Sequence, residues 1–178
     1  YKTYEEDVKN GLIPFFYGGT IGSTCTNSSD PVDVLGKFCR EKGIHYNVDS
    51  AYASSFMCIP DIRERYDLEY INSICINLSK AGLCGLGSSQ FYVDDKHMFV
   101  ESISGKNDSN LIALPEYLNN EVTANDDVVD YTNWQTGWGR RFEALKIFFV
   151  YQRFGTEGFQ EYINHIIKLS DHVVEKVN

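Results

Sequence analysis

The sequence predicts an α/β fold built on a mostly parallel β-sheet with flanking helices. The first observation is the order of two apolar runs, residues 12–17 and 44–48, which are separated by a glycine- and hydroxyl-rich loop and a helical segment. This strand–loop–helix–strand order is typical of a βαβ unit, whose strands are parallel. The second is a further apolar run at residues 71–76. The third is a hydrophobic fraction of 43%, which is sufficient for a buried core.

The first βαβ unit has recognisable boundaries. Residues 12–17 lie between Gly11 and a pair of glycines, which predicts a short buried strand followed by a loop. Asp30 and Pro31 then predict the N-cap and the first residue of a helix. Gly43 predicts the end of that helix, directly before the strand at residues 44–48.

The second half of the chain alternates between short elements and one long polar stretch. Residues 90–93 predict a strand and residues 96–104 a short helix. Residues 105–133 are polar with little periodicity, and connections of that length are usually functional or mobile. Residues 139–154 predict an amphipathic helix that ends at Gly155, and a further helix follows.

Charge and cysteine usage exclude several classes of function. The net charge of −9 argues against nucleic acid or an anionic membrane surface as a partner, and no apolar stretch is long enough to span a bilayer. The five cysteines are odd in number and widely spaced, so we expect buried cytosolic thiols rather than a disulfide framework or a metal site. The first residues form no signal peptide and include no initiator Met, which predicts a fragment or an excised region.

An aspartate and a lysine follow two of the predicted strands. Asp49 follows the apolar run at residues 44–48, and Lys80 follows the stretch from residue 71 to residue 79. If both runs belong to one parallel sheet, both side chains emerge at its carboxyl edge, where open α/β sheets bind ligands. A carboxylate and an amine at such an edge suit pyridoxal phosphate, in which lysine forms the Schiff base and aspartate keeps the pyridine nitrogen protonated. Taken singly, each residue is more often a solvent-facing lysine or a turn-forming aspartate.

Four motifs follow one another along the chain. Residues 22–24 read G-S-T, residues 48–53 read V-D-S-A-Y-A, residues 130–135 read D-Y-T-N-W-Q and residues 139–142 read G-R-R-F. In this order they resemble the G-T-T, V-D-A-A-Y-A, D-Y-x-x-W-Q and G-R-R-F motifs of the group II pyridoxal-phosphate decarboxylases, and specifically of the plant aromatic L-amino-acid decarboxylases that act on tyrosine, tryptophan or phenylalanine. The resemblance covers essentially the whole chain.

The resemblance implies a larger architecture. Residues 1–143 correspond to the second half of a fold type I, transferase-like large domain, and residues 144–178 to a linking helix and the start of the C-terminal domain. The chain is then a partial one, without the N-terminal dimerisation segment, the histidine that stacks on the cofactor, or the upstream phosphate-binding residues. The intact protein is expected to be a cytoplasmic homodimer.

The resemblance also implies roles around the cofactor. Lys80 corresponds to the Schiff-base lysine and Asp49 to the partner of the pyridine nitrogen. Ala51 lies against the ring face, Thr24 lies near the ring, and Asn77 contacts the phosphate. Without the family context, the last three would be explained equally well as turn packing, a loop hydroxyl and a strand-end amide.

Further residues complete the expected site. Ser79 stands beside the lysine as a hydrogen-bond donor for the phosphate. Gly139 corresponds to a glycine whose backbone reaches the partner subunit's site. Tyr117 corresponds to a tyrosine on a mobile loop that donates the proton to the substrate carbon after decarboxylation. As an ordinary loop tyrosine, it would be only a surface anchor.

The sequence departs from the family pattern beside the lysine. The usual N-x-H-K-W is residues 77–81 here, with Ser79 for the histidine and Ala81 for the tryptophan. Asn47 stands where the family usually has histidine, and a pair of glycines at 18–19 replaces a bulkier pair. These changes leave three hypotheses open: a decarboxylase that forms an amine, a decarboxylase-deaminase that forms an aldehyde, and an inactive remnant. Tyr117 favours the amine, because related aldehyde synthases carry phenylalanine there.

Overall fold

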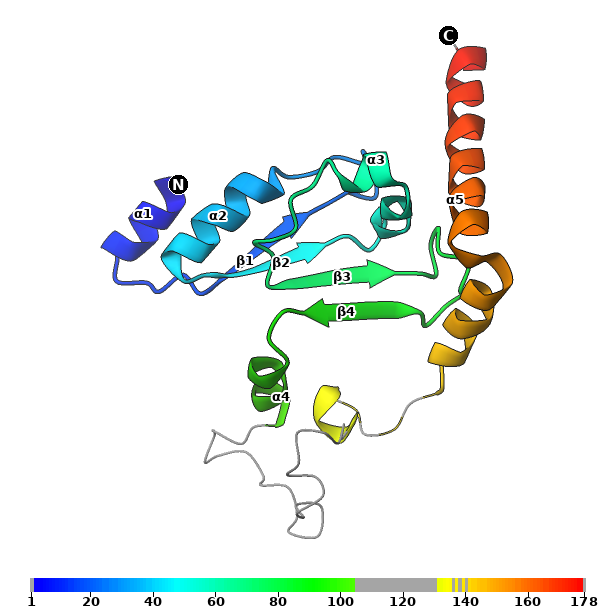
Figure 1. Cartoon of the computed structure of the whole chain (residues 1–178). Coiled ribbons are helices and arrows are strands. Elements are labelled where there is room, and N and C mark those ends of the chain that lie inside the picture. The colour runs from blue at the N-terminus through cyan, green and yellow to red at the C-terminus, as the bar shows by residue number, and fades with distance from the viewer. Residues whose placement is uncertain (1, 105–130, 136, 138, 140, 178) are drawn as a thin grey trace. The chain divides into compact units, whose positions relative to one another are not determined.

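The computed structural model describes residues 2–104, 131–135, 137, 139 and 141–177 (Figure 1). The chain divides into two compact units, Tyr1–Tyr92 with Glu143–Asn178, and Val93–Phe142. In the described part of the chain, no helix is both long enough and apolar enough to cross a membrane. The domain boundary expected at residue 143 stays a prediction.

The first unit is organised around a four-stranded sheet in the order β1-β2-β3-β4. Its strands are β1 (Phe16–Thr20), β2 (His45–Asp49), β3 (Ser73–Asn77) and β4 (Ser89–Val93). The first three are parallel to one another, and the arrow of β4 runs opposite to that of β3 (Figure 1). The predicted α/β fold with a mostly parallel sheet is confirmed.

One face of the sheet packs on helix α2 (Val32–Lys42) and carries the core of the unit. Alternate residues of β2 and its approach, Ile44, Tyr46 and Val48, are at most 6% exposed. They pack with Val32 and Cys39 of the helix in one hydrophobic cluster. The side chains that alternate with them therefore lie on the other face of the sheet, which leads to the candidate site.

Strand β1 begins later than the apolar run predicts. The sequence predicts a buried strand at residues 12–17, whereas β1 starts at Phe16. The side chains of Ile13 and Phe15 are 86% and 75% exposed. The strand continues through both glycines that the sequence assigned to a loop. The reason is tertiary: a Cβ on Gly19 would lie 2.5 Å from the hydroxyl oxygen of Tyr46, so glycine makes room for that ring.

The ends of α2 test the two capping predictions. Asp30 does not cap the helix; its carboxylate instead accepts the backbone N–H of Thr20 at 2.8 Å, and α2 begins at Val32, one residue after Pro31. The predicted stop at Gly43 is confirmed, because this residue adopts a left-handed conformation with φ of 68°.

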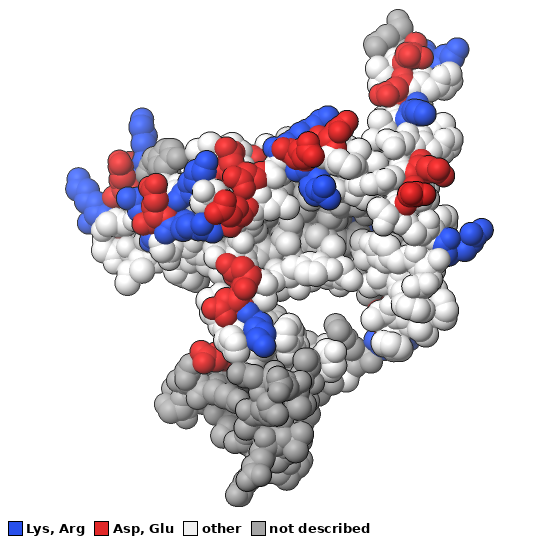
Figure 2. Space-filling view, in the orientation of Figure 1, with Lys and Arg blue, Asp and Glu red and all other residues white. Residues whose placement is uncertain are grey.

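The sequence-based prediction did not include the first helix of the first unit, and it placed the start of the last one too early. Helix α1 (Lys2–Lys9), which was not predicted, contacts α2 through an edge-on pair of rings, Tyr4 and Phe38, with centroids 5.2 Å apart. Acidic and basic side chains intermix over α1 and α2 (Figure 2). Helix α5 (Ala144–Val177) starts five residues later than expected, and Gly155 breaks it as predicted, with φ of 60° and ψ of −175°.

The segment after β2 connects the sheet to α5. It forms a 3₁₀ turn, η1 (Ser54–Cys58), and a short helix, α3 (Pro60–Arg63). Gln160 of α5 donates a hydrogen bond from its side-chain nitrogen to the backbone oxygen of Cys58 at 2.7 Å. Phe159 and Ile163 are buried beside it, so the middle of α5 belongs to the core of the first unit.

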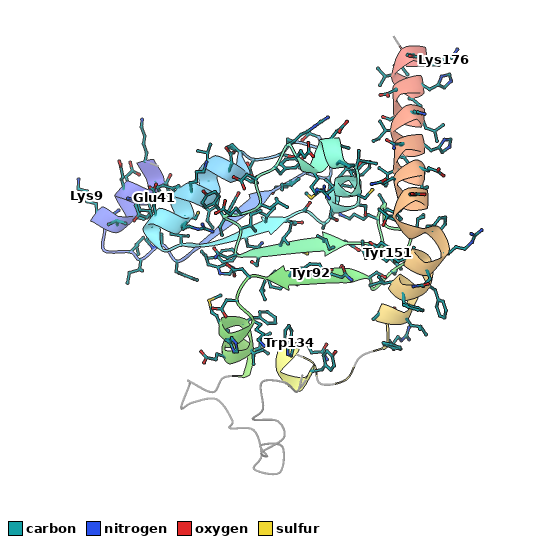
Figure 3. The ribbon with its side chains drawn as sticks, in the orientation of Figure 1. Lys9, Glu41, Tyr92, Trp134, Tyr151 and Lys176 are labelled. Carbon is teal, nitrogen blue, oxygen red and sulfur yellow. The ribbon has the colours of Figure 1, made fainter. Side chains whose placement is uncertain are left out.

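The second unit contains α4 (Lys96–Ser104), at the predicted bounds, and a 3₁₀ turn, η3 (Tyr131–Trp134). Trp134, labelled in Figure 3, lies against Phe99 of α4 with ring centroids 6.3 Å apart. Most of the predicted polar connection, residues 105–130, lies outside the described residues.

All five cysteines are free thiols. Cys39 and Cys84 are buried as expected, and burial raises the pKa of both. Cys25 is exposed, contrary to the expectation of buried thiols, because it lies on the surface loop that follows β1.

Candidate functional site

The carboxyl ends of β1, β2 and β3 meet at one edge of the sheet. Thr20 pairs with Asp49, so β1 and β2 end at the same level, and Asp49 pairs with Cys75, two residues before β3 ends at Asn77. The loop after β1 lies directly against the segment after β2. Gly22 has φ of 74°, and a Cβ on it would lie 2.2 Å from the Cβ of Ala53. A glycine is required here by both the backbone conformation and the close approach.

Asp49 presents a free acceptor at this edge. Its Oδ1 accepts the backbone N–H of Ala51 at 2.9 Å, and its backbone oxygen accepts the N–H of Ile21 at 3.0 Å. Among the described residues, no group donates to Oδ2, and the side chain is exposed. The carboxylate is therefore fixed through one oxygen and available through the other.

Lys80 lies in the turn three residues after β3, beyond the strand that was predicted at residues 71–76. Its backbone N–H donates to the oxygen of Asn77 at 3.2 Å. Its Nζ lies 5.9 Å from the centre of the Tyr52 ring, at the long end of the range for a cation–π contact. Within the described part of the chain no carboxylate lies within 4.0 Å of Nζ, so the amine is not held in an ion pair there.

The charges of Asp49 and Lys80 both act on the thiol of Cys75. The pKa of the Cys75 thiol is raised, first by burial and then by the negative charge of Asp49, and the positive charge of Lys80 opposes that rise. Sequence reasoning missed both Cys75 and Tyr52. The parallel register that pairs Cys75 with Asp49 would have been the signal for the first, but register cannot be read from the sequence.

Asn77 and Ser79 form a closed turn before the lysine. The Oδ1 of Asn77 accepts the backbone N–H of Ser79 at 2.9 Å and the hydroxyl of Ser79 at 2.5 Å. The single hydroxyl hydrogen of Ser79 is therefore already used, and the donor that this turn offers to a ligand is the amide NH2 of Asn77.

The other predicted site residues are placed less closely. Ala51 is half-buried beside Asp49, whereas Thr24 is exposed on the loop after β1. In that loop, three hydroxyls bond to one another at 2.8–3.0 Å, those of Ser23, Thr26 and Ser28. Gly139 belongs to the second unit, and Tyr117 lies outside the described residues.

The groups that the structure brings together fit pyridoxal phosphate. The unused oxygen of Asp49 suits a protonated ring nitrogen, the unpaired amine of Lys80 suits the carbonyl carbon, and the amide of Asn77 suits a phosphate oxygen. Ala51 presents only a methyl group beside Asp49, which leaves room for a flat ring. Among the described residues there is no group of three or more metal-binding side chains.

Comparison with known proteins agrees with this chemistry. Tyrosine decarboxylase 2 of Narcissus pseudonarcissus is 35% identical over 165 residues, which are 92% of this chain and 31% of the relative. The crystal structure of Catharanthus roseus tryptophan decarboxylase in complex with L-tryptophan is 34% identical, with a TM-score of 0.77 over 90% of this chain and 32% of that one. The crystal structure of Rhodiola rosea 4-hydroxyphenylacetaldehyde synthase is 28% identical, with a TM-score of 0.84 over 99% of this chain and 33% of that one.

The chain thus spans about a third of the length of the relatives it matches. The profile of the pyridoxal-dependent decarboxylase conserved domain matches residues 1–178, which is the full sequence given. This match shows that the chain belongs to the pyridoxal-dependent decarboxylase family.

Proposed function

We propose that this chain forms part of an enzyme that removes the α-carboxyl group of an aromatic L-amino acid, giving the amine and CO2. The observation that carries the proposal is the sheet edge, where Asp49 offers an unused carboxylate oxygen and Lys80 an unpaired amine. Similarity to a tyrosine decarboxylase and a tryptophan decarboxylase supports an aromatic substrate. A homodimer in the cytoplasm is part of the proposal and follows from the family resemblance.

Each residue at the edge has a proposed task. When bound, pyridoxal phosphate supplies the electron-accepting ring that makes loss of CO2 possible. Asp49 accepts a hydrogen bond from the ring nitrogen and holds its proton in place. Lys80 would hold the cofactor through its amine, which suits the carbonyl carbon. Ala51 supports the ring face.

The remaining residues hold the phosphate and move a proton. Asn77 donates its amide hydrogens to the phosphate, while Ser79 fixes the orientation of that amide through two hydrogen bonds. Thr24 lies near the ring, and the backbone of Gly139 serves the site of the partner subunit. Tyr117 donates a proton to the α-carbon of the substrate after CO2 leaves.

The proposal is tested by the products of the reaction. The intact protein that contains this chain is supplied with pyridoxal phosphate and, in turn, with tyrosine, tryptophan and phenylalanine, and amine and CO2 are measured. We expect amine from at least one of them and none from Lys80→Ala. Lys37→Ala is the matched control, because Lys37 also lies over a tyrosine ring, at 5.4 Å from its centre, but on α2. No amine from the unaltered intact protein would refute the proposal.

A second candidate function is aldehyde formation by decarboxylation and oxidative deamination, in which O2 is the oxidant and is reduced to hydrogen peroxide. The observation in its favour is the similarity to 4-hydroxyphenylacetaldehyde synthase at a TM-score of 0.84. Tyr117 argues against it, because the protonation that this residue is proposed to perform gives the amine. Measuring aldehyde and hydrogen peroxide in the same reactions separates the two, since only the deamination produces them.

A further inference from the structure

A row of polar side chains lies behind Asp49 on the same face of the sheet. His45, Asn47 and Asp49 alternate along β2 with the buried residues of the opposite face. Ser73 of β3 pairs in register with Asn47 and is only 2% exposed. Strands of parallel sheets are usually apolar on both faces, so polar residues in this row call for an explanation.

The row is joined by two short hydrogen bonds. The Ser73 hydroxyl donates to Oδ1 of Asn47 at 2.8 Å. The hydroxyl oxygen of Ser73 also lies 2.8 Å from Nε2 of His45. A serine hydroxyl has one hydrogen, and the amide oxygen can only accept. Ser73 must therefore accept from His45, which places a proton on Nε2. The hydrogen bonds therefore run in one direction, with His45 donating to Ser73 and Ser73 donating to Asn47.

The two residues at the ends of this hydrogen-bond series, His45 and Asn47, have defined surroundings. The imidazole of His45 stacks on the ring of Phe16 in β1, with centroids 5.8 Å apart and planes 8° from parallel. Because the oxygen of Asn47 faces Ser73, its NH2 group is left as a donor. Among the described residues this NH2 has no hydrogen-bond acceptor. The next side chain along this face of β2 is Asp49, about 7 Å away at two residues of strand rise.

We propose that His45, Ser73 and Asn47 are positioning residues for Asp49, with the NH2 of Asn47 donating through one bridging water to Oδ2 of Asp49. One bridging water, with two hydrogen bonds of about 2.8 Å each, spans up to about 5.6 Å, a distance that two side chains can leave between them when their Cα atoms lie about 7 Å apart. Such a bridge is nearly as favourable as a direct bond. Hydrogen bonds in series polarise one another, so the bond from His45 strengthens the Asn47 donor. The family usually has a histidine at position 47. In this protein the imidazole of His45 lies in the same row behind Asp49.

This inference rests on the proposed function, because it assigns the hydrogen-bond series a role in holding the partner of the cofactor ring. The test compares the full chain with Ser73→Ala, which removes the link, and Ser73→Thr, which keeps a hydroxyl on a strand. Asn47→Asp keeps the acceptor for Ser73 but removes the NH2. Tyr46→Phe is the matched control, because it deletes a buried hydroxyl without a hydrogen-bond partner on the other face of the same strand.

Two readouts separate positioning from a merely structural role. In the cofactor-free chain, ¹⁵N NMR reports which nitrogen of His45 carries the proton, and ¹³C NMR follows the Asp49 carboxylate. We expect the proton on Nε2, and a displaced carboxylate signal in Ser73→Ala and Asn47→Asp but not in Ser73→Thr or Tyr46→Phe. In absorbance titrations, Ser73→Ala is expected to bind pyridoxal phosphate roughly tenfold more weakly, the loss that corresponds to one hydrogen bond.

The outcomes are distinguishable. A proton on Nδ1 of His45 would reverse the direction of the hydrogen-bond series and overturn the inference. Equal cofactor affinity, or an unmoved Asp49 signal, in a folded Ser73→Ala chain would also overturn it while leaving the proposed function standing. If Ser73→Ala does not fold, Asn47→Asp decides by the same two criteria. If the unaltered chain binds no pyridoxal phosphate, the proposed function fails and the inference fails with it.

Discussion

Gly22 holds the two loops of the site together, and replacing it should disturb stability and cofactor binding at once. Its φ of 74° is the left-handed conformation, which costs a residue with a Cβ about 1–2 kcal/mol. The added Cβ of Gly22→Ala would also lie 2.2 Å from the Cβ of Ala53 and 2.9 Å from Oδ1 of Asn27, an overlap worth about 1–3 kcal/mol. We therefore expect a loss of about 2–5 kcal/mol in the free energy of unfolding.

A double-mutant cycle separates the two contributions. Ala53→Gly removes the nearest atom but leaves the backbone conformation of residue 22 as it is. In the background of Ala53→Gly, the cost of Gly22→Ala should fall toward the conformational share of about 1–2 kcal/mol, with the contact to Asn27 still in place. Urea denaturation gives each free energy of unfolding. A titration with pyridoxal phosphate should show weaker binding for Gly22→Ala, because the loop that carries Thr24 moves away from the segment at Ala51.

Two results would refute this reasoning. A loss below about 1 kcal/mol for Gly22→Ala would mean that neither the conformation nor the contact requires glycine. An unchanged cost in the Ala53→Gly background would mean that the close approach of the two loops is not what constrains the residue.

Three further predictions follow from contacts around the site. Gly19→Ala should lower the free energy of unfolding, measured by urea denaturation, by about 1–3 kcal/mol, because the new Cβ overlaps the Tyr46 ring. In a chain that already carries Tyr46→Leu, the cost of Gly19→Ala should largely disappear, and an unchanged cost would contradict this cause. Ser79→His should raise the affinity for pyridoxal phosphate by up to about tenfold in absorbance titrations, since imidazole supplies a donor that the turn-bound serine does not; an unchanged affinity would count against a phosphate site here. Burial raises the pKa of Cys39 above its ordinary value of 9.0, so the unfolded thiol ionises first and stability should fall as pH rises above that value. Cys39→Ala should make the fall between about pH 8 and about pH 10 smaller, and an identical fall would contradict the assignment.

The sequence predicted the parts of the fold that depend on local pattern. The strands at residues 44–48 and 71–76 were found at His45–Asp49 and Ser73–Asn77, and α4 was found at its predicted bounds. Gly43 and Gly155 were correctly identified as helix ends because their backbone conformations are local properties. Each of these signals lies within a few residues of the feature it marks.

The misplaced elements depend on residues distant in sequence. Gly18 and Gly19 looked like a loop, and only the position of Tyr46 beneath the strand explains why glycines belong to β1. Asp30 has the composition of an N-cap, but its carboxylate is used by the backbone of Thr20. An apolar run such as residues 12–17 cannot show that most of its side chains are exposed in this chain.

The same distinction applies to the candidate site. Asp49 was predicted from the end of its strand, and the structure adds that one of its oxygens is already bound by the N–H of Ala51. The use of the Ser79 hydroxyl by Asn77 and the hydrogen-bond series from His45 to Asn47 depend on side-chain orientation and on strand register. Neither is encoded in residue spacing alone.

The central claim is that Asp49 and Lys80 form a site for pyridoxal phosphate. The most direct measurement is incubation of the chain with pyridoxal phosphate, reduction with sodium borohydride to fix the cofactor on the amine that binds it, and peptide mass spectrometry. The account predicts near-stoichiometric labelling of the peptide that contains Lys80, with little on Lys37, and a marked decrease in Asp49→Ala. Labelling spread equally over surface lysines, or unchanged in Asp49→Ala, would contradict it.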